Sequence, residues 1–93
     1  MVKVWKSIST EYGITEEGKR QIGHGGVNDL QNSLLITIRD LDENDQPTRV
    51  DVLFRKTPYK YSYIDIEREL ERMEDLNWIY RLPYSELIRH EIH

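Results

Sequence analysis

Two stretches of the chain, residues 33–40 and 48–56, alternate apolar with polar or mixed positions. A period of two residues predicts β-strands, since successive side chains of a strand point to opposite faces. The connection between the two stretches, 41–47, is polar and contains Pro47, which is typical of a turn. We therefore expect a β-hairpin. Its core-facing positions are Leu34, Ile36, Ile38, Val50, Val52 and Phe54.

A different period follows in residues 62–77. Here the apolar positions recur every three or four residues, which predicts one apolar stripe along a helix. Ser62, with Asp65 three residues later, is typical of a capping box at the start of a helix. The stripe consists of Ile66, Leu70, Met73 and Leu76.

The remaining segments carry weaker signals. Residues 2–8 alternate briefly and predict a short strand. Residues 11–31 hold all five glycines, so we expect a loop with at most one helical turn after Thr15. Residues 84–92 fit either a short helix capped by Ser85 or an edge strand, and the pattern leaves both open.

Together these elements predict an α+β fold, a small two-layer sandwich. Its antiparallel sheet would have three or four strands, including 2–8, 33–40 and 48–56, with the 62–77 helix across one face. At 93 residues we expect a single domain, 1–93. The apolar content is a modest 38%, so completion of the core by a second copy, as a homodimer, is an open alternative.

Composition narrows the function classes. A formal charge of −4 argues against a general nucleic-acid binder, which usually carries net positive charge. The chain has no cysteine, which excludes disulfides, zinc–thiolate sites and thiol catalysis. No apolar run is typical of a signal peptide or a membrane span, so we expect a cytoplasmic protein without membrane contact.

Candidate chemistry is sparse. His90 and His93 have a spacing that can chelate a metal on a helix, but no third ligand is indicated. The glycines of 18–26 match neither the GxGxxG nor the GxxxxGK pattern of nucleotide-binding loops. None of the serines lies in a nucleophile elbow. The carboxylates fall in runs typical of solvated faces. We therefore expect no enzyme activity, no metal site and no cofactor.

Two kinds of binding surface remain as hypotheses. Tyrosine and tryptophan anchor many protein interfaces, and here they gather at the two ends of the predicted helix. This favours a non-enzymatic protein-binding module, an adaptor or inhibitor of the kind found among phage and mobile-element accessory proteins. An acidic rim over 40–45 would steer a basic partner. The expected anchors are Tyr61, Trp78, Tyr80 and Tyr84.

The alternative is a nucleic-acid-associated module built on the glycine-rich basic loop 18–26. Its phosphate contacts would be Lys6, Lys19 and Arg20.

Overall fold

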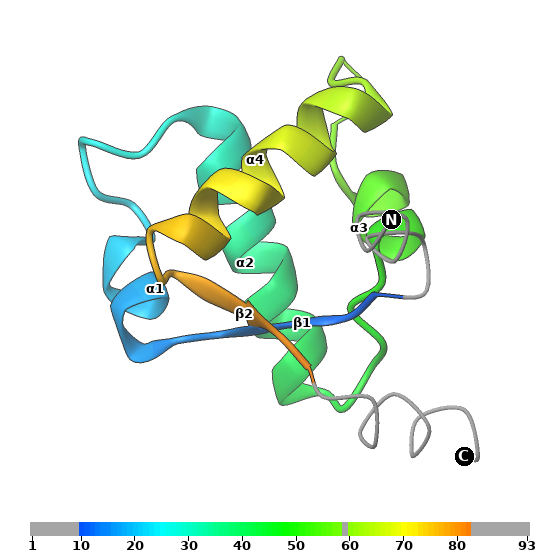
Figure 1. The fold of residues 1–93 in the computed structure, drawn as a ribbon, viewed down its shortest axis with the longest axis horizontal. Coiled ribbons are helices and arrows are strands. Elements are labelled where there is room, and N and C mark those ends of the chain that lie inside the picture. Colours follow the sequence, from blue (N-terminus) through cyan, green and yellow to red (C-terminus); the bar gives the residue numbers. More distant parts are fainter. Residues whose placement is uncertain (1–9, 59, 83–93) are drawn as a thin grey trace.

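The computed structural model describes residues 10–58 and 60–82. In these ranges the element order is β1 (Tyr12–Ile14), α1 (Glu16–Gln21), α2 (Asp29–Glu43), α3 (Val50–Lys56), α4 (Tyr63–Asp75) and β2 (Ile79–Arg81). The described part of the chain is thus mainly helical. Figure 1 shows α4 crossing α2, with β1 and β2 side by side at the end of α4.

The expected sandwich with a sheet of three or four strands is wrong. The sheet of the described residues has two antiparallel strands, with Gly13 opposite Tyr80. Neither strand was expected: β1 lies in the predicted loop, and β2 follows the predicted helix. The expected strand 2–8 and the segment 84–92 lie outside the described residues.

The predicted strand 33–40 is the middle of α2. A capping box begins this helix, with the Asn28 side chain accepting from the Gln31 backbone N–H and the Gln31 side chain accepting from the Asn28 backbone N–H. From there the buried positions recur at helical rather than strand spacing. Leu35, expected on the mixed face, is fully buried, while Ile36 is half-buried. The buried apolar side chains of α2 are Leu30, Leu34, Leu35, Ile38 and Leu41.

The second predicted strand, 48–56, is also wrong, since it contains the short helix α3. Val50 and Leu53, three residues apart, are buried. Their helical spacing turns Phe54 outward, and Phe54 is 39% exposed instead of facing the core. β-branched residues such as those of this segment favour strands only locally, and packing against the rest of the chain decides the outcome.

The predicted helix over 62–77 is present as α4. Ser62 and Asp65 form the expected capping box, and Ile66, Leu70 and Met73 are buried. Leu76 was expected in the same stripe but is 47% exposed, because α4 has ended at Asp75.

Helices α2 and α4 end in the same way. In each, the first residue after the C-cap has a positive φ: Asp45 (57°) after α2 and Asn77 (65°) after α4. The next backbone N–H then reaches back to the last turn, from Gln46 to the Leu41 carbonyl and from Trp78 to the Met73 carbonyl. This is the Schellman arrangement, which satisfies the free carbonyls of a helix end and reverses the chain.

The core lies between α2, α3, α4 and the inner face of the sheet. Tyr12, Ile14 and Ile79 point from the strands into it. Helix α2 is the central element, since it contacts β1, α1, α3 and α4. The outer face of the sheet carries Gly13 and Tyr80, and the Tyr80 ring lies against Gly13.

Candidate protein-binding surface

Tyr61 lies in the connection between α3 and α4. It is half-buried and packs against the core. The Lys60 ammonium lies 5.2 Å from the centre of its ring, a cation–π contact.

Two surface hollows are each lined by both Tyr61 and Asp29. The larger, of 480 Å³, lies between the N-terminal ends of α2 and α4 and is also lined by Asp65, Arg68 and Glu69. The smaller, of 320 Å³, includes Ile36 and Pro58. Both are open to solvent, and the Tyr61 side chain lines both of them.

Trp78 and Tyr80 lie at the other end of α4. Trp78 is half-buried against the core, and its carbonyl accepts hydrogen bonds from the backbone N–H and the hydroxyl of Thr15, each at 3.0 Å. Tyr80 is 44% exposed on the outer face of the sheet. Tyr84 lies outside the described residues.

The length of α4 separates the expected anchors. Its 13 residues span about 20 Å at the usual rise per residue. Tyr61 precedes this helix, whereas Trp78 and Tyr80 follow it. The structure therefore does not bring Tyr61 together with the other two into one contact patch.

A second group of exposed apolar side chains lies where α3 approaches the start of α4. Ile64 is 63% exposed and Phe54 is 39% exposed. The rings of Phe54 and Tyr63 lie 5.5 Å apart, centre to centre, with a tilt of 55°. We call Phe54, Tyr63 and Ile64 the apolar corner. Tyr61 lies between these residues in the chain, two positions before Tyr63.

Sequence reasoning missed this corner for a definite reason. Phe54 was assigned to a strand face, and Ile64 falls outside the stripe that begins at Ile66. A helical reading of 50–56 would have placed Phe54 outside, because Val50 and Leu53 occupy the inward positions.

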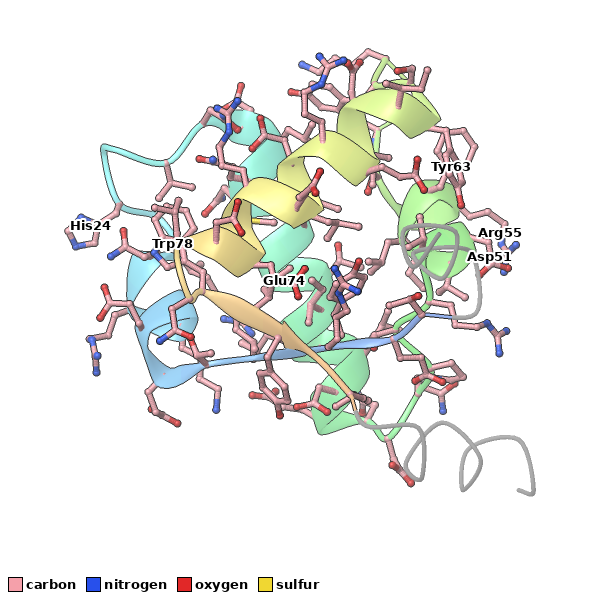
Figure 2. The ribbon with its side chains drawn as sticks, viewed as in Figure 1. His24, Asp51, Arg55, Tyr63, Glu74 and Trp78 are labelled. Carbon is pink, nitrogen blue, oxygen red and sulfur yellow. The ribbon has the colours of Figure 1, made fainter. Side chains whose placement is uncertain are left out.

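Charged groups border the apolar corner. One carboxylate oxygen of Asp51, Oδ1, lies 3.5 Å from Arg49 Nε. The other, Oδ2, lies 3.5 Å from Arg55 Nη1. Figure 2 shows Asp51, Arg55 and Tyr63 together on one side of the molecule. Partial burial, with the negative charges of Glu67 and Asp51, raises the pKa of the Tyr63 hydroxyl. Tyr63 thus presents a neutral hydroxyl at neutral pH.

The basic residues of the glycine-rich loop are paired locally. Lys19 Nζ lies 3.6 Å from a Glu16 carboxylate oxygen, and Arg20 Nη2 lies 2.8 Å from one of Glu17. Hydrogen bonds from Arg20 and Gln21 lower the pKa of the Glu17 carboxyl. Each of these two cations faces a carboxylate one turn away. Lys6 lies outside the described residues.

The acidic residues 40–45 occupy the last turn of α2 and the turn after it. Helix α2 spans about 22 Å, so this acidic end lies far from the start of the helix, where Tyr61 lines both hollows. A further open hollow of 560 Å³ lies beside the acidic end, lined by residues that include Asp40, Leu41 and Lys56.

Within residues 10–58 and 60–82, no group of three or more histidine or acidic side chains is arranged to hold a metal ion. Across the same described ranges, no helix combines the length and apolar character that crossing a membrane requires.

Comparison with known proteins returned no match: no family model, no curated protein and no solved structure is similar to this chain.

Proposed function

We propose that this chain is a non-enzymatic protein-binding module, an adaptor or inhibitor that acts by covering a partner's surface from the apolar corner. The absence of cysteine fits a cytoplasmic location, which we include in the proposal. The observation that carries it is the contact between the rings of Phe54 on α3 and Tyr63 on α4, with the exposed Ile64 next to Tyr63 on the same helix.

Large apolar side chains that gather on the surface usually mark a contact site, whereas single exposed ones do not. Phe54 and Ile64 are exposed although nearby Leu53 and Ile66 are fully buried. Aromatic rings bring large contact area with few rotatable bonds, so they lose little entropy when an interface forms.

The hollows support contact with a partner rather than enclosure of a small molecule. Ligand pockets normally bury most of the ligand behind mainly apolar walls. The 480 Å³ hollow beside Tyr61 is open, and its lining carries the charged residues Asp29, Asp65, Arg68 and Glu69. We therefore keep Tyr61 in the proposal as a residue at the edge of the contact surface.

Affinity capture with matched variants tests this proposal. Tagged chain would be incubated with lysate of the source organism, and bound proteins quantified by mass spectrometry. The double variant Phe54→Ser/Ile64→Ser should lose a stoichiometric partner that the original chain retains. Leu76→Ser is the control, because Leu76 is similarly exposed but lies beyond the other end of α4.

The sequence predicts anchors at both ends of α4, so a variant at each end can be compared for its capture of the partner. Tyr61→Ala should weaken capture, whereas Tyr80→Ser should not. Equal capture by the original chain and the Phe54→Ser/Ile64→Ser variant would refute the proposal, provided that both chains unfold at the same urea concentration.

A further inference from the structure

We draw no further inference here: the strongest candidate, the open 480 Å³ hollow between the N-terminal ends of α2 and α4, is bordered by two carboxylates that already accept hydrogen bonds within the chain, Asp65 from the Ser62 backbone N–H and Glu69 from the Gln31 side chain, and nothing in the structure shows what would occupy it.

Discussion

Gly18 in α1 lies directly against the backbone carbonyl of Trp78, too close for a β-carbon to fit between them. The same carbonyl accepts hydrogen bonds from the backbone N–H and hydroxyl of Thr15, whose hydroxyl in turn accepts from the Gly18 N–H at 2.9 Å. These contacts join the start of α1 to the turn that connects α4 to β2. They tie together parts of the chain more than 60 residues apart in sequence.

Gly18→Ala should destabilise the protein by about 1–3 kcal/mol, because the added methyl group must displace the Trp78 backbone. The direction of this change in stability is informative, since replacing glycine by alanine inside an unobstructed helix usually stabilises the helix. Urea denaturation measures the effect. Gly25→Ala is the control, since no atom lies within 4 Å of its added methyl group, and its midpoint should hardly change.

Leu70→Ala should cost about 2–5 kcal/mol in unfolding free energy, because Leu70 is 1% exposed in the centre of the core. Leu76→Ala makes the same chemical change at a side chain that is 47% exposed. It should cost a small fraction of that amount. Similar denaturation midpoints for the two variants would contradict the assignment of the α4 core face.

Thr48→Val should destabilise by about 1–3 kcal/mol for each buried group that it leaves unpaired. The Thr48 hydroxyl accepts a hydrogen bond from the Tyr12 backbone N–H at 2.8 Å and donates one to the Tyr12 carbonyl at 2.5 Å. It therefore satisfies both backbone polar groups of Tyr12, the first residue of β1. Thr37→Val is the matched control, because its hydroxyl bonds to the Ser33 carbonyl within α2. Faster hydrogen exchange at the Tyr12 amide would locate the effect.

Stability should fall at high pH through Tyr12. Burial first, and then the negative charge of Glu74, raise the pKa of Tyr12 to about 12 from the ordinary value of 10.0. Between these pKa values the unfolded chain loses the Tyr12 proton while the folded chain keeps it. This contribution to stability is therefore complete below pH 10.0 and is lost as the pH rises towards about 12.

Comparison with Tyr12→Phe isolates the contribution of Tyr12 ionisation to the pH dependence of stability. The difference in unfolding free energy between the original chain and the variant should shrink or reverse over this pH window, by an amount on the order of 2–3 kcal/mol. A difference independent of pH would show that the Tyr12 hydroxyl titrates normally in the folded state.

Asp45→Gly should stabilise the protein. Asp45 adopts a φ of 57°, which costs an ordinary residue about 1 kcal/mol but costs glycine little. The change also removes a carboxylate from the C-terminal end of α2, where the helix dipole is negative and the last turn carries no basic residue. Asp45→Asn removes the charge at the same position and keeps a side chain of the same shape, so it separates the two contributions in thermal denaturation.

Local signals in the sequence were sufficient for α4. Its capping residues, Ser62 and Asp65, and its stripe, Ile66, Leu70 and Met73, depend on spacing within a single segment. Thr15 was considered as the cap of at most one helical turn within an expected loop, and in the structure it caps the six-residue helix α1. Such features can be predicted because the interacting groups are three or four residues apart.

Residues 33–40 show where local reasoning failed. Leu34, Ile36 and Ile38 have the spacing of a strand, while Leu34, Leu35 and Ile38 have that of a helix, so the segment fits both. Burial of Leu35 against the other elements decides for the helix. The capping box of Asn28 and Gln31 was a local signal for that helix and was missed.

The candidate surface depended even more on tertiary structure. Sequence clustering put Tyr61, Trp78 and Tyr80 into one set of anchors, and α4 holds them at its two ends. Phe54 and Tyr63 meet because the chain turns back between α3 and α4.

The sequence by itself determined the charge, the lack of cysteine, and those helices whose caps and apolar stripes lie within a few residues of each other. The tertiary structure decided which of two apolar periods residues 33–40 follow, which strands pair, and which aromatic side chains stay in solvent. The physical reason is that these outcomes depend on burial against distant segments, whose free energy outweighs the small local preferences of each residue.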